Sequence, residues 1–426
     1  MKTILKFVGG ILVVLVLFIG IIYLSVSRTE DTFRTCRILS FEDTNTVDFR
    51  DFDSVMVAAN TLYEADELKK VIQGEQYREV WATPVKVPIA FLDTLKGGLQ
   101  IIEEGGGKQT HSLELEDSTG IRYALRSLSK DPAPLVPEIA KKLGLENIVV
   151  DGVSAQHPYA ALVVSALADK AKILTTQPKL FFVPKQESLG IYNDKYGNRL
   201  YYFEYESEGK IDWTGIDSVE ELIDTEDLQE MKMEGKSVVI DHNALIRARL
   251  FDLIIGDWDR HAKQWGWAMV RNKDTYLAVP IPTDRDNAFF KQDGVLPTLI
   301  ANDLTLPMIQ TFTEKIENLE GLVRPFDEYF LRSASSEQFQ KEALYLQNSL
   351  SDNVIDEAFD CWPRVIDSLH GKPLRYTVKT RRNDILQYAI EFHSILKKRP
   401  LQKQELHGSE DLQLPDHLTM CFDCRD

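Results

Sequence analysis

Four aspartates lie close together in a stretch rich in large apolar residues, IIGDWDRHAKQWGWAMVRNKDTYLAVPIPTDRDNAFF, at residues 254–290. They are Asp257, Asp259, Asp284 and Asp286. Carboxylates are costly to bury unless a cation, a hydrogen-bond donor or a metal ion compensates their charge. Their placement among tryptophans and phenylalanines therefore indicates an organised site, in which neighbouring charges shift pKa values for a function.

A purely structural interpretation of the same residues stays open. Arg260 and Arg285 each stand next to these aspartates, so Asp–Arg pairs would brace a corner of the hydrophobic core. His261 would orient the loop that carries Asp259 or pack on aromatic rings, and a metal-ligand role is the alternative for this histidine.

The motif DWDRHAKQW at residues 257–265, followed by DRDNAF at 284–289, resembles the catalytic core of atypical kinases. The pattern is similar to that of HipA-type kinases, CotH spore-coat kinases, secretory-pathway casein kinases and phosphoinositide kinases. The resemblance implies an α+β, bilobal protein-kinase-like fold with a small β-rich N-lobe and a larger helical C-lobe. It also implies Mg²⁺-dependent phosphoryl transfer from ATP to an unknown acceptor.

The resemblance assigns the catalytic loop to Asp259, Arg260 and His261. Asp259 would orient or deprotonate the acceptor hydroxyl. Arg260, together with Asp284, would hold the two acidic loops in register.

The resemblance places Mg²⁺ between the same two loops. Gln264 stands where these kinases have an asparagine, and Asp286 stands at the metal-holding aspartate, with Asp284 beside it. Gln264 still offers a carbonyl oxygen, but its longer side chain would shift the ion unless the loop compensates.

The nucleotide-binding half of the resemblance lies upstream. Arg126 occupies the place of the phosphate-pairing lysine, with Lys130 as the alternative, and Glu204 lies in the expected hinge strand 202–205. A glycine-rich turn, whose backbone can approach phosphate closely, would be formed by Gly105, Gly106, Gly107 and Lys108.

Three departures from the kinase pattern favour a second function, a non-catalytic kinase-like module that binds a nucleotide, a phosphorylated ligand or a partner protein at the cell surface. They are Gln264 in place of asparagine, Arg126 in place of lysine, and Gln156 or His157 near the position of the usual glutamate. The presence of Asp259 and Asp286 favours the enzyme. Residues 70–400 also resemble a group of uncharacterised exported bacterial proteins.

Other chemistries have weaker support in the sequence. There is no GxSxG nucleophile motif and no HExxH zinc motif. Asp241 and His242, together with Asp257 and Asp259, are an alternative set of ligands for a divalent-metal phosphoesterase.

The elements that must position these residues follow from periodicity and turn signals. Short alternating runs separated by glycine predict an antiparallel meander over 81–130, and two further strands are expected at Leu180–Val183 and Leu200–Tyr205. Apolar residues at helical spacing predict a buried helix over 155–172 and a helix at Ala244–Ile255 that delivers the aspartate loop.

Two regions complete this expectation. The run VMVAANTLYEADELKKVI, Val55–Ile72, is interpreted as a helix. From residue 218 onward the pattern is mostly helical, interrupted by one strand at Tyr276–Ile281.

The N-terminus carries a 20-residue uncharged segment, Phe7–Val26, which is just long enough to cross a bilayer as a helix. Lys2 and Lys6 precede it and would stay inside, so the protein is expected to be a single-pass membrane protein with its body exported to the periplasmic or extracellular side. A cleaved signal peptide, with small residues at 25–27, is the alternative.

The composition limits the partners. The 426 residues carry a formal net charge of −17, which disfavours nucleic acid as a partner, and the oligomeric state is not encoded in any visible pattern. The kinase resemblance implies a nucleotide and an unknown acceptor as partners, and the N-terminal helix implies the membrane.

Four cysteines are too few for a disulfide scaffold. The CxxC of Cys421 and Cys424 indicates a terminal disulfide or an inert tail rather than a zinc site, and Cys36 and Cys361 are a possible second pair.

The organisation expected from these observations has six segments. They are a basic start at 1–6, a transmembrane segment at 7–26, an N-terminal extension at 27–80, a β-rich nucleotide-binding lobe at 81–206, a helical catalytic lobe at 207–400 and a tail at 401–426.

Overall fold

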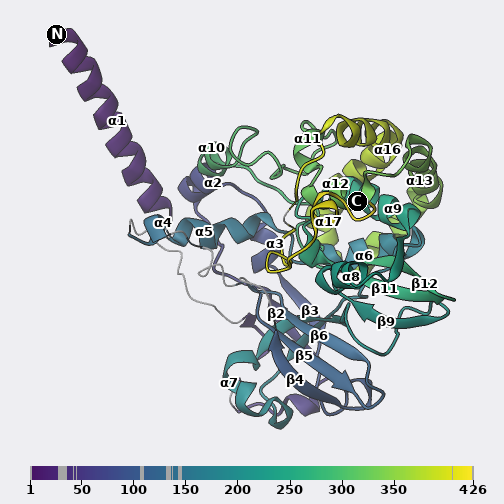
Figure 1. Ribbon diagram of the computed structural model, residues 1–426. Helices are drawn as coiled ribbons and strands as arrows, with labels where there is room; N and C mark the ends of the chain where they lie inside the picture. The colour runs from purple at the N-terminus through teal and green to yellow at the C-terminus, as the bar shows by residue number, and fades with distance from the viewer. Residues whose placement is uncertain are drawn as a thin grey trace.

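The computed structural model describes residues 2–26, 36–41, 43–44, 46–105, 110–130, 136, 138–142, 146–404 and 406–424. Over these ranges the chain is a mixed α+β protein with three β-sheets and many helices (Figure 1). The expected α+β class is therefore confirmed.

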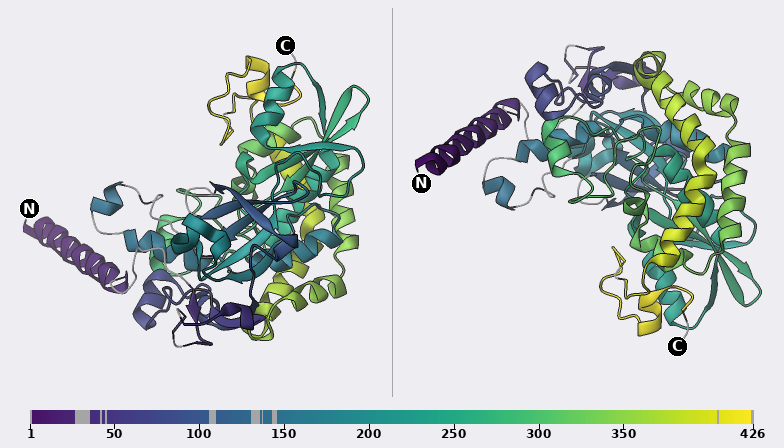
Figure 2. Two further views of the ribbon diagram at one scale, coloured as in Figure 1. Left: turned by 90° about the horizontal axis from the view of Figure 1, so that it is seen from below. Right: turned by 90° about the horizontal axis from the view of Figure 1, so that it is seen from above.

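The N-terminal helix α1 (Lys2–Val26) extends away from the body in every view (Figures 1 and 2). Its apolar side chains are exposed except near its C-terminal end, where Ile22 and Val26 are buried. Among the described residues it is the one helix long and apolar enough to cross a membrane, from Thr3 to Val26. The expected span of 7–26 is thus part of a longer helix.

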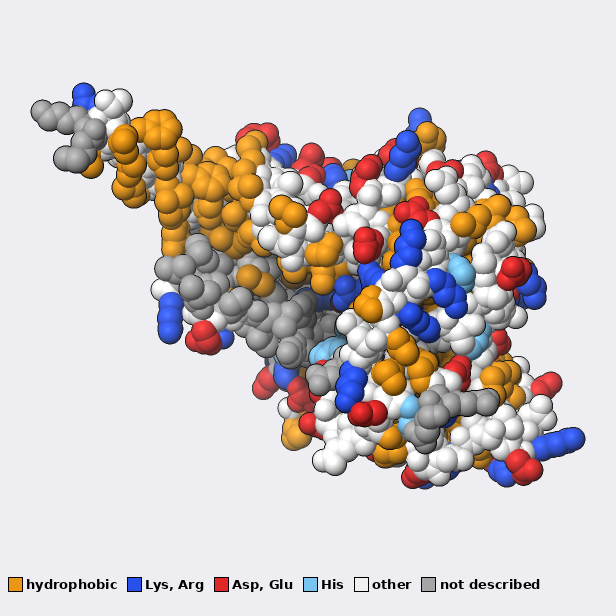
Figure 3. Space-filling model, turned by 45° about the horizontal axis from the view of Figure 1, so that its top comes forward, with side chains coloured by type: hydrophobic (Ala, Val, Ile, Leu, Met, Phe, Trp, Pro, Cys, Tyr) orange, Lys and Arg blue, Asp and Glu red, His pale blue; other side chains and the backbone are white. Residues whose placement is uncertain are grey.

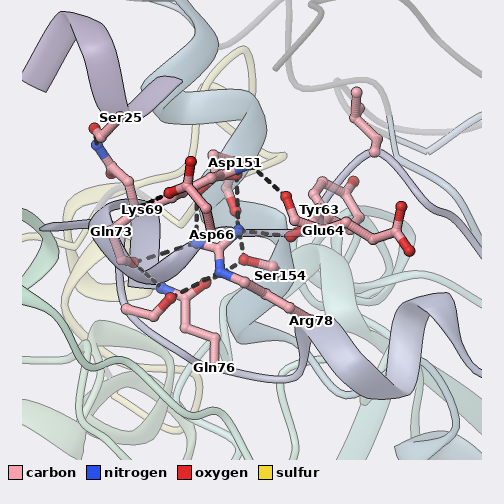
Figure 4. A network of polar contacts seen from close by, with 12 residues as sticks. Ser25, Tyr63, Glu64, Asp66, Lys69, Gln73, Gln76, Arg78, Asp151 and Ser154 are labelled. Carbon is pink, nitrogen blue, oxygen red and sulfur yellow. Dashed lines mark hydrogen bonds and ion pairs between the residues drawn. The ribbon is translucent and has the colours of Figure 1, made fainter. Parts of the chain in front are cut away.

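The end of α1 is held to the body by a buried polar network (Figure 4). Gln73 Nε2 donates to Ser25 Oγ at 2.9 Å. Nearby, the Asp151 carboxylate pairs with Lys69 at 2.7 Å and with Arg78 at 2.5 Å. Burial lowers the pKa of Lys69, and the adjacent Asp151 partly offsets that effect. The network therefore joins α1 to helices that are far apart in sequence.

A five-stranded antiparallel sheet has the order β4-β5-β6-β8-β7. Tyr123 and Leu125 on β6 point into the core of one face, so Arg126, at the next position, points to the opposite face. The predicted meander and the two predicted strands are confirmed as β4 (Leu99–Gly105), β5 (Ser112–Asp117), β6 (Arg122–Ser127), β7 (Lys179–Val183) and β8 (Arg199–Tyr205).

The predicted helix over 155–172 is confirmed as α6, although it begins later, at Ala160, and ends at Lys170. Residues 153–155 form a 3-10 turn, and Pro158 follows before the helix starts. The shorter helices around it are α4 (Glu138–Lys142), α5 (Glu146–Gly152) and α7 (Asn193–Tyr196).

The prediction of one helix over Val55–Ile72 is wrong for its first half. Val55 and Val57 are buried while Met56 is exposed, which is the two-residue alternation of a strand. A three-stranded sheet forms from β1 (Arg37–Ile38), β2 (Ser54–Ala58) and β3 (Pro84–Pro88), and the helices that lie between β2 and β3 are α2 (Glu67–Gln73) and α3 (Arg78–Ala82).

The expectation of a mostly helical chain with one strand after residue 218 is also incomplete. A four-stranded sheet has the order β10-β12-β11-β9, of which the strand expected at Tyr276–Ile281 is β12. Its strands are β9 (Val219–Ile223), β10 (Ser237–Ile240), β11 (Trp265–Asn272) and β12 (Thr275–Pro282), with α8 (Thr225–Met233) between β9 and β10. Residues 265–269 are all buried, so β11 lacks the alternation that marks a half-exposed strand.

The rest of the chain is helical, as expected. The predicted helix at Ala244–Ile255 is α9 (His242–Ile255), and it packs against the long helix α16 (Lys372–Lys398) and against α13 (Ser336–Ser349). The other helices are α10 (Val295–Ile300), α11 (Leu319–Leu322), α12 (Pro325–Leu331), α14 (Asp352–Ala358), α15 (Arg364–Ile366) and α17 (Asp416–Met420).

One hydrophobic core connects both halves of the chain. It includes Phe182 and Leu200 from the five-stranded sheet as well as Phe251 and Phe289 from the helical part.

The four cysteines form one disulfide and two free thiols. Cys421 and Cys424 are bonded to each other, whereas Cys36, which is buried, and Cys361, which is exposed, are both free. Pairing of Cys36 with Cys361 is therefore wrong.

Candidate active site

A cleft of about 750 Å³, including its part open to solvent, lies between the five-stranded sheet, α6 and the loop after β12. Its polar lining includes side chains from several segments that are far apart in sequence. These side chains are Arg126, Lys130, Gln156, His157, Thr176, Glu204, Asp284, Arg285 and Asp286. The cleft therefore joins the expected nucleotide-binding residues to the second acidic loop.

Helix α9 delivers the first acidic loop. Asp241 caps its start by accepting a hydrogen bond from the backbone N–H of Ala244 at 3.0 Å. The helix ends at Gly256, which has φ 72° and sits against the ring of Phe312. A side chain there would be strained in this left-handed conformation and would also collide with Phe312. Gly256 thus turns the chain sharply into Asp257.

Asp252, inside α9, ties the two acidic loops together. It is fully buried and pairs with Arg249 at 2.9 Å, Arg260 at 3.1 Å and Arg285 at 3.0 Å. Burial opposes its ionisation, but the three guanidinium groups outweigh burial and keep the pKa of Asp252 below its usual value. Because Arg260 belongs to the first loop and Arg285 to the second, their positions depend on one carboxylate. The sequence predicts this helix only as the element that delivers the aspartate loop, and no sequence signal singles out Asp252.

Arg260 also engages Gln264. Its Nη1 donates to Gln264 Oε1 at 3.1 Å and to the carbonyl oxygen of Thr283 at 2.8 Å. Gln264 is buried, and its backbone carbonyl accepts from Thr283 N at 3.0 Å. The amide oxygen expected to bind Mg²⁺ is therefore already hydrogen-bonded to a cation.

Lys130 meets Asp286 within the cleft. Lys130 Nζ forms an ion pair with Asp286 Oδ2, and Asn287 Nδ2 donates to Asp286 Oδ1 at 3.0 Å. Burial, then repulsion from Asp284, raises the pKa of Asp286 to about 7 despite the attraction of Lys130. Burial alone would lower the pKa of Lys130, but Asp286 and Asp284 together raise it. The lysine thus stays charged between acidic groups.

Two further aspartates complete this acidic group. Asp284 has φ 48°, in the left-handed region that a non-glycine residue enters only when its surroundings enforce it. Burial would raise its pKa, yet Lys130 and Arg126 lower it overall. Asp259 is half-buried, and its charge contributes to the pKa values of both Lys130 and Asp286. Asp259, Asp284 and Asp286 are therefore electrostatic neighbours around one lysine.

Asp257, in contrast, faces the core. Burial raises its pKa well above the usual value, and the distance to Arg260 is 3.9 Å. Its Oδ1 accepts from the backbone N–H of Asp259 at 3.2 Å. Asp257 therefore supports the loop from inside.

Arg126 finds its acidic partner on the neighbouring strand. Its Nε lies 2.7 Å from Glu204 Oε1, and its Nη2 lies 3.8 Å from Glu206. Burial raises the pKa of Glu204 to about 7, although Arg126 favours the charged form. Arg126 therefore has its acidic partner on β8 and not on α6.

The residues near the expected glutamate position make other contacts. Gln156 Nε2 donates to Asn287 Oδ1 at 2.8 Å. The His157 ring stacks on Trp362 with centroids 4.4 Å apart, and burial lowers its pKa well below the usual value. His157 is therefore a core histidine. His261 packs edge-on against His407 at 4.9 Å, as its aromatic-packing interpretation expects, and burial lowers its pKa.

The glycine-rich turn is described only at its first residue. Gly105 ends β4 opposite Ser112, whereas Gly106, Gly107 and Lys108 lie outside the described residues. Thr110, which follows, lines the cleft.

Metal binding has limited support from the side chains. Within the ranges that the structure describes, no group of three His, Cys, Asp or Glu residues is arranged to hold a metal ion. The alternative phosphoesterase set is wrong, because Asp241 and Asp257 lie at opposite ends of the 14-residue helix α9, about 20 Å apart at 1.5 Å per residue. Asp284 and Asp286 are half-buried carboxylates that line the cleft.

Comparison with known proteins adds little to this geometry. No protein-family model matches the chain, and no curated protein matches it. Among solved structures, a Helicobacter pylori proinflammatory kinase, CtkA, is similar over 69% of this chain and 96% of its own, with a TM-score of 0.35 and 14% identity. This likeness is too loose to support a shared mechanism, so the chemistry must be drawn from the residues of this chain.

Proposed function

We propose that this protein is a membrane-anchored, exported kinase-like protein that binds ATP in the cleft and transfers its terminal phosphoryl group to an acceptor hydroxyl. The observation that carries the proposal is the contact of Lys130 with Asp286, with Asp284 and Asp259 nearby. A buried cation facing several carboxylates is the arrangement needed to hold phosphate and Mg²⁺ side by side.

The cations provide the phosphate side of the site. Lys130 is the better anchor, because its partner Asp286 belongs to the second acidic loop, whereas Arg126 pairs at 2.7 Å with Glu204 on the neighbouring strand. A triphosphate entering the cleft would replace the Asp286 carboxylate as the partner of Lys130.

The carboxylates provide the metal side. Asp286 and Asp284 would hold Mg²⁺, which when bound neutralises charge on the transferring phosphoryl group. Gln264 would join them only after leaving Arg260, to which its amide oxygen is bonded at 3.1 Å.

Asp259 would orient the acceptor hydroxyl and take up its proton as the phosphoryl group is transferred. Its position is set indirectly: Gly256 turns the chain into the loop, Asp257 holds the Asp259 backbone, and Arg260 is fixed by Asp252. These are positioning residues, and the acceptor contact itself belongs to Asp259.

The anchor is proposed to remain uncleaved. Lys2 and Lys6 favour a cytoplasmic N-terminus, which places the body on the exported side. Cleavage near Ser25 would remove the side chain that accepts from Gln73 and the Ile22 contact of the body, so those buried contacts favour retention of α1.

A thermal-shift titration of the full chain with ATP, with and without Mg²⁺, tests this function. A ligand at about 100 times its dissociation constant stabilises the folded state by about 2.7 kcal/mol, so a clear upward shift is expected. Asp286→Ala should lose the Mg²⁺-dependent part of the shift. An unchanged melting temperature at millimolar nucleotide would contradict nucleotide binding.

The non-catalytic binding module remains the second candidate, favoured by the Arg260–Gln264 hydrogen bond. It predicts a nucleotide-induced shift that does not depend on Mg²⁺ and no transfer of labelled phosphate to any acceptor or to water.

A further inference from the structure

The body of the protein contacts α1 within the apolar segment itself. Ile22 of α1 packs with Ile72 of α2 and Leu296 of α10 in one buried group, and Phe18 packs against it. These contacts begin well before α1 ends at Val26. Helix α2 therefore lies against the last turns of the proposed membrane span, and α10 packs on α2 (Figure 1).

Helix geometry gives the depth of this contact along the proposed membrane span. Phe18 precedes Val26 by about 12 Å along the helix at 1.5 Å per residue. If the span Phe7–Val26 fills a hydrocarbon core of about 30 Å, the elements that touch Phe18 and Ile22 must reach the lipid boundary. Parts of the body at that level would meet lipid as well as water.

Several of the side chains exposed at this place are apolar. On α10 and the turn after it, Leu299 is 59% exposed, Ile300 is 50% exposed and Leu304 is 95% exposed. On α2, Leu68 and Val71 share one helix face and are 42% and 61% exposed. A leucine as exposed as Leu304 next to other apolar side chains indicates a contact surface.

The turn that presents Leu304 is ordered by its own hydrogen bonds. Thr305 Oγ1 donates to the carbonyl oxygen of Ile300 at 2.6 Å, and the Asn302 side chain accepts from the backbone N–H of Leu304 at 3.0 Å. Leu304 is thus held outward by the fold. In space-filling view, hydrophobic side chains cover α1 and recur on the adjoining part of the body (Figure 3).

We propose that α10, the turn at 301–305 and the exposed face of α2 form a second membrane-contact surface that rests in the lipid interface beside α1. Lipid is the occupant that the geometry favours, because this surface continues directly from the contact with α1. The interaction is apolar rather than ionic: Asp303 and Glu67 lie on or next to the surface, and the chain carries −17 overall, so anionic headgroups are not required.

This inference rests on the proposed membrane anchoring by α1. Its consequence is that the body does not swing freely on α1 but keeps one orientation relative to the bilayer, since two separate elements contact lipid.

Depth-dependent quenching in the full chain tests the surface. A polarity-sensitive fluorophore is attached at Leu299→Cys or Leu304→Cys in a Cys361→Ser background, which removes the exposed native thiol. The protein is placed in phosphatidylcholine nanodiscs containing a doxyl quencher high on the acyl chain. Both sites should lose roughly half of their emission, because an interfacial element lies about 5–10 Å into the headgroup–acyl boundary.

Two further sites make the outcomes distinguishable. Leu344→Cys on α13, 47% exposed and away from α1, is the matched control and should keep its emission. Leu15→Cys, inside α1, reports whether α1 itself is inserted in the membrane. If Leu15 is quenched and the 299 and 304 sites are not, the surface proposal is overturned while the anchor stands. If Leu15 is not quenched, the anchor fails and the proposal fails with it. Protection of 299 and 304 from aqueous iodide without lipid quenching would indicate a protein partner and would also overturn it.

Discussion

Replacement of Asp252 by asparagine is the sharpest test of how the two acidic loops are held together. The substitution keeps the size of the side chain but removes the charge that pairs with Arg249, Arg260 and Arg285. Arg249 keeps its ion pair with Asp327 at 2.5 Å, so the removal of the Asp252 charge affects mainly Arg260 and Arg285. These two arginines are buried: Arg285 would lose its carboxylate partner, and Arg260 would keep only Asp257 at 3.9 Å.

The expected magnitude follows from that geometry. Removing one partner of a buried ion pair costs about 3–5 kcal/mol, because the remaining charge stays desolvated and unpaired. We expect Asp252→Asn to lower the free energy of unfolding by this amount in urea titrations of the full chain followed by tryptophan fluorescence. It should also remove the thermal shift by Mg²⁺–ATP, since Arg260 and Arg285 position both acidic loops.

Asp151→Asn is the matched control. Asp151 is equally buried and pairs with two cations, Lys69 and Arg78, but makes no ion pair with either acidic loop. It should lose comparable stability and keep nucleotide binding at temperatures where the variant is folded. A loss below about 1 kcal/mol for Asp252→Asn would refute the reasoning, because changes of that size are typical of ordinary surface and partly buried sites. Equal loss of nucleotide binding in both variants would refute the specific role of Asp252.

Three further predictions concern single residues. Lys130→Met should abolish the nucleotide-induced thermal shift, whereas Lys185→Met, at an exposed lysine paired with Asp194, should leave it unchanged; a normal shift in Lys130→Met would exclude Lys130 as the phosphate anchor. Glu204 has a folded-state pKa of about 7, raised from 4.5 by burial, so its contribution to stability is present at low pH and is lost as the pH rises toward 7. Wild type should therefore lose stability relative to Glu204→Gln between pH 4.5 and 7, and parallel unfolding curves over that window would contradict the assignment. Gly256→Ala should lower the free energy of unfolding by about 1–3 kcal/mol, through strain in the left-handed backbone and a clash with Phe312. Gly215 has nearly the same φ but open space around it, so Gly215→Ala measures the strain alone. Equal losses in free energy of unfolding for the two variants would show that Phe312 plays no part.

Much of the fold that surrounds the site follows from local patterns. The meander β4–β5–β6 is marked by alternating runs and glycines, and α9 is marked by helical spacing that ends at Gly256. These patterns depend on residues that are close together in the sequence, so they can be detected without any knowledge of tertiary contacts.

Two of the strands that are not predicted are missed for different reasons. β11 has no alternation to detect, because residues 265–269 are all in the core. The other is β2, at the start of the run from Val55. This run is interpreted as a helix because a short apolar run does not by itself distinguish a strand from a buried helix. Its pairing with β3, which decides the matter, is a contact between distant segments.

In the candidate site, too, some residues are evident from the sequence, whereas others depend on contacts that form only on folding. The acidic residues at 257, 259, 284 and 286 are conspicuous in the sequence, because charge among tryptophans is unusual. The role of Asp252 was not predictable, since it depends on three arginines that meet only after folding. The choice between Arg126 and Lys130 likewise depends on strand register, which sets Ala124 opposite Glu204 and so brings Glu204 to Arg126.

Labelling with an acyl-phosphate derivative of ATP tests the central claim most directly. In this reagent the acyl group is joined to the terminal phosphate. A lysine beside that phosphate, once its ammonium has lost a proton to solvent, attacks the acyl carbon; the C–O bond to phosphate breaks, the lysine becomes acylated, its second proton goes to solvent and ATP is released. The account predicts that mass spectrometry finds Lys130 as the labelled residue, that excess Mg²⁺–ATP protects it, and that Asp286→Ala weakens the Mg²⁺ dependence of protection. Absence of label on Lys130, or labelling that ATP does not suppress, would contradict a nucleotide site in this cleft.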